Sequence, residues 1–168
     1  MRKLVGRLGV ILLMVSLIMT ISPKFVLAAS SSAVTSTFES RDLSGEDFSS
    51  RNLQSADFTK VKLIKANFSN SDLRGAVFNG VVAEEANFHG ADMSNILTYV
   101  TSFDGADLTN AILREAIMKR TTFKDAKVDG ADFTMAILDK DQVIQLCKRA
   151  KGINPVTGAS TRQSLGCP

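Results

Sequence analysis

One residue series, mostly phenylalanine and leucine, recurs at every fifth position from Phe38 to Leu138. The series runs through 21 pentads without an insertion. A period of five fits neither the 3.6-residue turn of a helix nor the two-residue alternation of a strand, so ordinary amphipathic elements are excluded here. Unbroken internal repetition instead indicates a repeat architecture, in which each unit contacts only its neighbours.

A second series of small residues, usually alanine, stands two positions before each of these centres. One large and one small inward residue per pentad describe a short bent strand followed by a corner. The resulting pattern, A(D/N)LXX, resembles the pentapeptide-repeat family, and Ala56-Asp57-Phe58 and Ala131-Asp132-Phe133 match it closely. The resemblance covers about two thirds of the chain. It implies an all-β solenoid, a right-handed quadrilateral β-helix of about five coils with four pentads per coil.

Four pentads per coil would place residues 20 apart above one another, which sorts the inward residues into columns. One column comprises Phe38, Phe58, Phe78, Thr98, Met118 and Leu138, and another comprises Phe48, Phe68, Phe88, Leu108 and Val128. We expect these columns to fill the interior. Ala83 leaves room that Val81 or a nearby phenylalanine can fill, and a buried Thr98 hydroxyl needs a backbone carbonyl.

The corners and the residues before the centres carry weaker signals. One corner column, Ser50, Asn70, Gly90, Asn110 and Gly130, suits a turn with positive φ. The corner of a second column is expected to be less demanding in its turn conformation, because its residues are mixed: Gly45, Lys65, Glu85, Gly105 and Asp125. The Asp and Asn residues before the centres can bond to turn backbone. A stacked cation site is the alternative, but the regular repeat explains their polarity without a ligand.

The N-terminus is typical of an export signal. Basic residues at 2, 3 and 7 precede an apolar run, and a small-residue cleavage site ends at Ala28. We therefore expect a cleaved signal peptide over 1–28, a short extension over 29–35, the repeat over 36–140 and a helical cap over 141–168. The apolar run is too short to favour a spanning helix, so no stable membrane span is expected after cleavage, although an uncleaved anchor remains the alternative.

Signal removal changes what the charge implies. The whole chain has 20 Lys plus Arg and 17 Asp plus Glu, but removal of the four basic residues in 1–28 leaves 16 against 17, a net charge of −1. The basic precursor therefore does not indicate a nucleic-acid partner or an anionic membrane.

The tail breaks the five-residue period and carries both cysteines. Asp139 or Asp141 can cap a helix that runs to about Ala150, with Val143, Ile144, Leu146 and Cys147 facing inward. A shorter helix is expected within 160–165. Two cysteines in an exported chain are best interpreted as one disulfide, Cys147–Cys167, and a free redox-active pair is the alternative. Such a cap would cover the open end of the β-helix.

The tail from Leu146 to Pro168 is similar to that of exported pentapeptide-repeat proteins of the thylakoid lumen, which occur in cyanobacteria and chloroplasts. The similarity includes the paired cysteines and the NPxTG and TRxSL runs. It implies a cyanobacterial lumenal or periplasmic location, and it implies no activity.

Catalytic chemistry finds little support in the sequence. The single histidine, His89, is expected on the outside of a coil, where a convex rod offers no pocket. No P-loop, dinucleotide fingerprint or zinc spacing is present. With the interior filled, we expect no enzyme activity, no catalytic residues, no metal or cofactor and no small-molecule substrate.

Binding to a protein is the remaining class of function, and one outward column that is unexpectedly apolar is the candidate surface for it. The candidate interface comprises Val77, Leu97, Tyr99, Ile117 and Ile137. Exposed apolar stripes of this kind often mark interfaces for a protein partner or for self-association. The alternative is coverage by the C-terminal helix or by the N-terminal extension.

Two functions follow as hypotheses. The first is a non-enzymatic structural or protein-interaction module in the thylakoid lumen or periplasm. The second is a DNA-mimicking topoisomerase inhibitor, as some pentapeptide-repeat proteins are. Mimicry needs a strongly negative rod, so the near-neutral mature charge and the export signal weigh against it. A scaffold that senses redox state through Cys147 and Cys167 is a third possibility.

Overall fold

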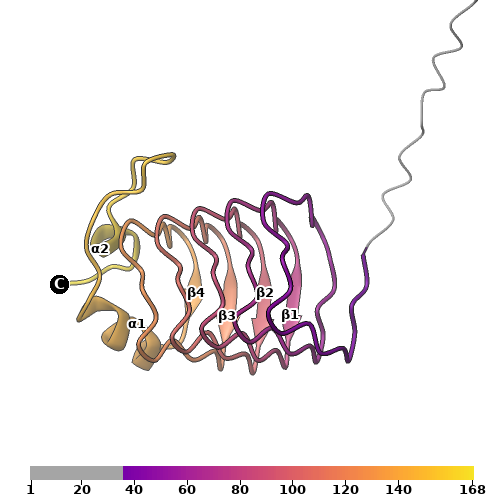
Figure 1. Ribbon diagram of the computed structural model, residues 1–168. Helices are drawn as coiled ribbons and strands as arrows, with labels where there is room; N and C mark the ends of the chain where they lie inside the picture. Colours follow the sequence, from indigo (N-terminus) through magenta and orange to yellow (C-terminus); the bar gives the residue numbers. More distant parts are fainter. Residues whose placement is uncertain (1–35) are drawn as a thin grey trace, which may run out of the picture. The chain divides into compact units, whose positions relative to one another are not determined.

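Residues 36–168 are described by the computed structural model, and they contain a stack of coils closed at one end by two short helices (Figure 1). The predicted signal peptide and extension, 1–28 and 29–35, lie outside the described residues. Backbone bridges join residues 20 apart, beginning with Thr37 to Asp57 and Asp57 to Val77. All bridges between coils are parallel. The repeat architecture predicted from the five-residue period, and the β-helix that the family resemblance implies, are therefore confirmed.

One face of the coils forms a continuous parallel sheet, in the order β1-β2-β3-β4. Its strands are β1 (Val77–Asn79), β2 (Leu97–Tyr99), β3 (Ile117–Lys119) and β4 (Ile137–Leu138). The register places Val77 beside Leu97, Leu97 beside Ile117, and Ile117 beside Ile137. The apolar, mostly β-branched residues on this face favour extended backbone. Elsewhere Asp and Asn occupy most of the corresponding positions, and those coil faces show isolated bridges.

The interior is filled by the predicted columns. In one column the ring centroids of Phe38 and Phe58 lie 4.8 Å apart, and those of Phe58 and Phe78 lie 4.9 Å apart, all stacked. These separations match the spacing between adjacent strands, so each ring sits directly on the ring of the next coil. Ala83 is fully buried. One coil later in the same column, the ring of Phe103 lies 5.3 Å from that of Phe88 in an edge-on arrangement.

The partner of the buried Thr98 differs from the expected carbonyl. The Thr98 Oγ1 lies 2.6 Å from the Oγ1 of Thr121, which is also buried. The Thr121 hydroxyl lies 3.3 Å from the carbonyl oxygen of Lys119, to which it can donate. A second hydroxyl therefore links Thr98 to the backbone.

The corners correct a second expectation. Every fifth residue from Ser40 to Met135 has a positive φ, and this includes Lys65 at 59° and Glu85 at 56°. The column predicted to be less demanding is therefore as constrained as the others. The reason is that each corner amide must point to the next coil, as the Lys65 amide does in donating to the Glu84 carbonyl at 2.9 Å. The coil geometry thus overrides the preference of L-residues for negative φ.

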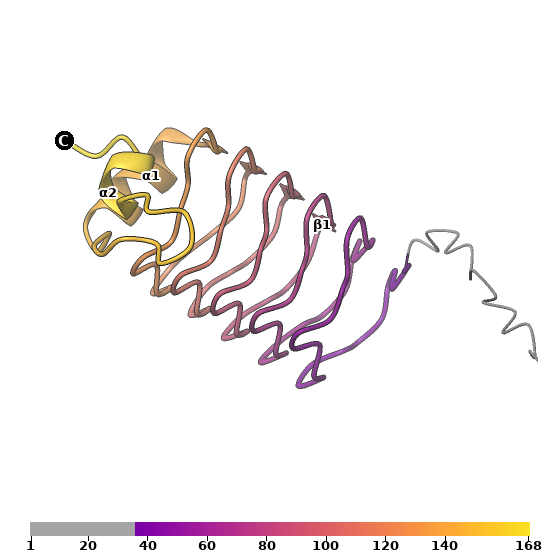
Figure 2. The ribbon, with the colours of Figure 1, turned by 90° about the horizontal axis from the view of Figure 1, so that it is seen from above.

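The C-terminal cap consists of α1 (Lys140–Cys147), α2 (Thr161–Ser164) and the loops around them (Figure 2). Asp139 is the N-cap of α1, as one of the two predicted candidates. The helix ends at Cys147, before the predicted Ala150. The disulfide between Cys147 and Cys167 is present, which confirms the predicted pairing. Within 36–168, no helix has the length and apolar character needed to cross a bilayer.

The inward stripe of α1 was only partly predicted. Leu146 is fully buried, and Cys147 packs against the core. Ile144, by contrast, is 49% exposed and does not face the coils. A helix that lies across an end of the tube contacts it over a narrow stripe, so one of the four predicted residues points to solvent.

Candidate interaction surfaces

The candidate interface forms a straight apolar ladder along the strands β1 to β4. Leu97, Ile117 and Ile137 are 40%, 41% and 50% exposed, whereas Val77 at the start of the ladder is half-buried. Because the strands are parallel and in register, these side chains stack at the strand spacing of about 4.8 Å. Their exposure shows that the C-terminal helices do not cover the ladder. Coverage by 29–35 falls outside the described residues.

The apolar surface is wider than the sequence predicted. Tyr99 and Val100 are 47% and 52% exposed beside Leu97, and Met135 is 74% exposed at the corner before β4. We call the six exposed residues, with Val77, the apolar face: Val77, Leu97, Tyr99, Val100, Ile117, Met135 and Ile137. Val100 and Met135 were missed because they occupy corner positions, where the repeat normally carries polar residues or glycine. A β-branched or long apolar residue at such a corner is the signal that would have found them.

Charged groups next to the apolar face are paired with one another. Lys119 forms an ion pair with Asp139 at 2.9 Å, and the Arg120 amide donates to the same carboxylate at 2.8 Å. The Arg120 guanidinium lies 5.6 Å from the ring centre of Tyr99 and donates to its hydroxyl at 2.8 Å. This pairing fixes the Tyr99 ring in place. A partner docking here would therefore meet a positioned aromatic ring and few unpaired charges.

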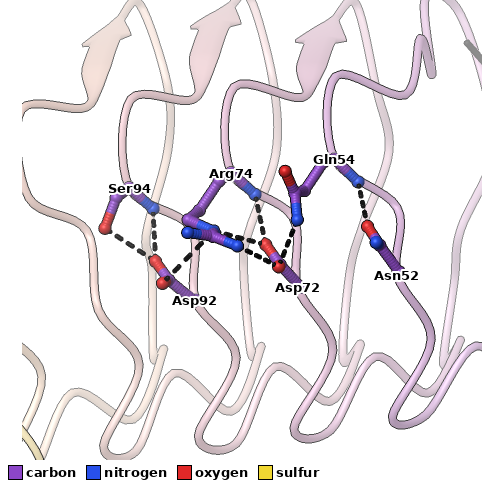
Figure 3. Close-up of polar contacts among 6 residues, drawn as sticks. All are labelled: Asn52, Gln54, Asp72, Arg74, Asp92 and Ser94. Carbon is purple, nitrogen blue, oxygen red and sulfur yellow. Dashed lines mark hydrogen bonds and ion pairs between the residues drawn. The ribbon is translucent and has the colours of Figure 1, made fainter. Parts of the chain in front are cut away.

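A polar cluster on another face shows what the Asp and Asn residues before the centres do (Figure 3). Asn52, Asp72 and Asp92 each accept a hydrogen bond from the amide two residues ahead, at 3.2, 3.3 and 3.0 Å. Arg74 binds both carboxylate oxygens of Asp72, at 2.8 and 2.6 Å, and lies 3.8 Å from Asp92. The carboxylates are thus occupied by turn amides and arginine, as the turn-backbone interpretation predicted.

The same contacts explain the acidity of Asp72. Hydrogen bonds from the Arg74 side chain, and more weakly from the Arg74 amide and from Gln54, hold the pKa of this carboxyl below its ordinary value of 3.8. Partial burial opposes the shift but does not reverse it. Among residues 36–168, no group of three or more His, Cys, Asp or Glu side chains is arranged to hold a metal ion.

His89, the single histidine, lies on the exposed outside of a coil, where its amide donates to Asn87 at 3.0 Å. Two hollows on the described surface lie side by side near the C-terminal cap. The first, of about 440 Å³, lies between residues 121–125 of the last coil and α1, and the second, of about 570 Å³, lies between 125–129 and 148–151. They share Asp125 and Arg149.

The cap attaches to the last coil through side chains that replace the missing next coil. Gln142 donates to the carbonyls of Met118 and Thr121, and Ser164 accepts from the Phe133 amide at 3.0 Å. Asn154 is 1% exposed and donates to the Gly130 carbonyl at 2.9 Å. Gln142 and Ser164 replace bonds that a further coil would make, since one coil earlier the Thr101 carbonyl accepts from the Thr122 amide at 2.9 Å and the Leu113 amide donates to the Asp132 carbonyl at 2.7 Å. The Asn154 contact is additional, because the Asn110 carbonyl one coil earlier accepts no backbone hydrogen bond among the described residues. The sequence did not single out their contacts, since each joins segments more than 20 residues apart.

Comparison with known proteins agrees with this geometry. The family model described as "Pentapeptide repeats" matches residues 36–70, 62–96 and 101–139. The chain is also similar to a crystal structure of a pentapeptide-repeat protein from the Arabidopsis thaliana thylakoid lumen. That match has a TM-score of 0.60 and 40% identity, and covers 80% of this chain and 92% of the other.

Two sequence relatives are also lumenal proteins of Arabidopsis thaliana. The chain is 57% identical over 42 residues to thylakoid lumenal protein TL20.3, and this match covers 25% of this chain and 15% of the relative. It is 49% identical over 47 residues to thylakoid lumenal 15 kDa protein 1, and this match covers 28% of this chain and 21% of the relative. The matches thus span about a fifth or less of these relatives. The lumenal location of the similar proteins confirms the prediction of an exported protein of the thylakoid lumen or periplasm.

Proposed function

The chain belongs to the pentapeptide-repeat family, and on that premise we propose that it is a non-enzymatic structural and protein-interaction module that engages a protein partner through its apolar face. Its location is the thylakoid lumen or the periplasm. The similarity to lumenal proteins supports this location, and the apolar face carries the interaction.

Exposure on one side of the molecule supports this function. Of the large hydrophobic residues that are exposed within 36–168, the majority lie on the apolar face, and the remainder lie in the cap. Single exposed hydrophobic residues are ordinary, but a contiguous patch of roughly several hundred Å² often marks a binding site. The paired charges beside Tyr99 lower the cost of desolvating the rim when a partner covers it.

The side chain of Val100 supports the same proposal. Its φ of 54° is imposed by the corner, as at the other corners of the coil, and its amide donates to the Lys119 carbonyl at 3.3 Å. The repeat normally carries polar residues or glycine at this position, whereas Val100 is apolar and 52% exposed. An exposed apolar corner beside Leu97 and Tyr99 favours a role in binding.

The test compares two double variants of the full-length protein in its own host. Leu97→Ser with Ile117→Ser interrupts the apolar face, whereas Ile153→Ser with Val156→Ser changes two cap residues that are 67% and 78% exposed. Crosslinking in intact thylakoid and periplasmic fractions would identify the captured proteins, and sedimentation of the purified protein would measure self-association.

We expect a defined set of crosslinks to disappear in the first variant and to persist in the second, with both variants folded by circular dichroism. If the two variants give the same crosslinks and the same sedimentation as the wild type, the apolar face is not the binding surface. Recovery of the processed protein only from the cytoplasm would contradict the proposed location.

A further inference from the structure

The edge of the last coil is paired unevenly, and the unpaired part lies along the two hollows beside the cap. In the coil before it, the amides of Phe103, Gly105 and Leu108 donate to carbonyls of the next coil at 2.9, 2.7 and 2.8 Å. The residues 20 positions later are Phe123, Asp125 and Val128. Their amides donate to no acceptor among the described residues. The cap therefore leaves a row of three donors open.

Two further groups in the same place also lack partners. The carbonyl of Ala106 accepts from the Lys127 amide at 2.9 Å, but its counterpart on Ala126 accepts no hydrogen bond within the described chain. The Nε of Arg149 is buried without an acceptor, although another guanidinium nitrogen of Arg149 donates to the Phe123 carbonyl. Buried polar groups are normally paired, so this nitrogen indicates a missing acceptor.

The open groups match the bonding pattern of a peptide backbone. In the preceding coil the corresponding row is satisfied by residues 122–127, a stretch of six residues that bends once at a corner. An extended segment of about this length could supply carbonyls to the three amides and one N–H to Ala126, as when a strand adds to a sheet edge. The hollows of about 440 and 570 Å³ have the size of typical ligand sites.

The charge of the hollows indicates which peptide would fit. The charged residues that line them are five basic and three acidic: Lys124, Lys127, Lys148, Arg149 and Lys151, with Asp125, Asp129 and Asp141. Two of the lysines are already paired, Lys127 with Asp107 and Lys151 with Asp129, each at 3.3 Å. Arg149 lines both hollows and adds a positive charge that they share.

We propose that this edge, over 121–129 and facing 141–151, is a second binding site, which takes an extended acidic peptide segment of another protein as one additional rung of the coil. The site is distinct from the apolar face, and it uses backbone hydrogen bonds where the apolar face uses hydrophobic contact. A partner therefore needs an unfolded acidic stretch free to adopt the bend of the coil.

The test uses a fluorescein-labelled octapeptide of alternating Asp and Thr, titrated into the full-length protein and followed by anisotropy. Two control peptides separate charge from strand addition: one carries Lys in place of each Asp, and the other is N-methylated at alternate residues. Nitrogen-15 correlation spectra would locate the contact. We expect shifts at the amides of Phe123, Asp125 and Val128 and little change at Phe103 and Leu108.

Arg149→Met keeps much of the aliphatic length but removes the guanidinium group and its charge, and Arg74→Met is the matched control on another face. We expect Arg149→Met to weaken binding about tenfold or more, the effect of losing one charged hydrogen bond, and Arg74→Met to leave it unchanged. Equal binding of the N-methylated or the lysine peptide would overturn the proposal, as would an absence of binding by the acidic peptide.

Hydrogen exchange in the free protein gives a second, variant-independent test. The amides of Phe123, Asp125 and Val128 should exchange much faster than those of Phe103, Gly105 and Leu108. Equal protection of both sets would show that the edge is already paired, and no peptide site would remain.

Discussion

Asn154 is expected to be among the most sensitive positions of the cap. It is 1% exposed, and its Nδ2 donates to the carbonyls of Gly130 and Asn110 at 2.9 and 3.1 Å. Its Oδ1 accepts from the amides of Val156 and Thr157, each at 3.0 Å. One side chain therefore both ties the cap to two coils and closes the turn that follows it.

The magnitude follows from these four hydrogen bonds. At about 1 kcal/mol each, their loss in Asn154→Ala amounts to about 4 kcal/mol, since the buried carbonyls lose their donors as well. A domain of this size is stabilised by only about 5–15 kcal/mol, so the variant should unfold at a much lower urea concentration. The assay is urea unfolding followed by far-UV circular dichroism, with linear extrapolation to water.

Asn154→Asp is the decisive comparison, because it retains the acceptor and replaces the donors by a carboxylate facing two carbonyls. At pH 7 it should be less stable than Asn154→Ala. At pH 4 the difference should shrink, because burial raises the pKa of such a carboxyl and its protonated form can donate. A loss below about 1 kcal/mol in Asn154→Ala would refute the reasoning. So would an Asp variant as stable as the wild type at pH 7.

Three further perturbations have defined outcomes. Val100→Gly should raise the free energy of unfolding by about 1 kcal/mol, because glycine adopts the positive φ of this corner without strain. A free energy of unfolding below that of the wild type, measured by urea unfolding, would contradict the presence of strain at Val100. Replacing Cys147 and Cys167 by serine should cost about 3 kcal/mol, the chain-entropy effect of a cross-link with a sequence separation of 20, measured against the oxidised wild type. Burial tends to raise the pKa of Asp132, but hydrogen bonds from the Thr134 side chain and amide outweigh it and hold that pKa below 3.8. A carboxyl whose pKa is lowered in the folded state stabilises the protein above about pH 4, and this stabilisation is lost as the pH falls through the folded pKa. The stability difference between wild type and Asp132→Asn should therefore shrink from pH 6 to pH 2. A constant difference would contradict this assignment.

The coil interior could be predicted because each inward residue is defined by its position within a pentad. The family resemblance implies four pentads per coil, and with that number the phenylalanine columns and the apolar residues on one outer face follow from the single period. The N-cap was narrowed to Asp139 or Asp141 by residue type next to the helix, and the structure has Asp139. The Cys147–Cys167 pairing was predicted because an exported chain with two cysteines offers one pairing.

The features that were missed depend on geometry that no local pattern carries. The positive φ at Lys65 and Glu85 comes from the corner, which imposes the same backbone on unfavourable residues. The contacts of Asn154 with Gly130 and of Arg149 with Phe123 join an irregular tail to the end of a regular coil. The open row of amides on the last coil likewise appears only when the path of the cap is known.

The hydrogen bonds between the cap and the last coil limit how the length of such a protein can change in evolution or by engineering. Gln142, Asn154 and Ser164 each meet a specific side of the last coil. Insertion of 20 residues, one whole coil, would present the same sides again, and the cap would still fit. Insertion of a single pentad would rotate the cap by a quarter of a turn relative to the coil, so each of these side chains would meet the wrong backbone groups. The cap therefore restricts changes in length to whole coils of 20 residues, although the sequence repeat is five residues.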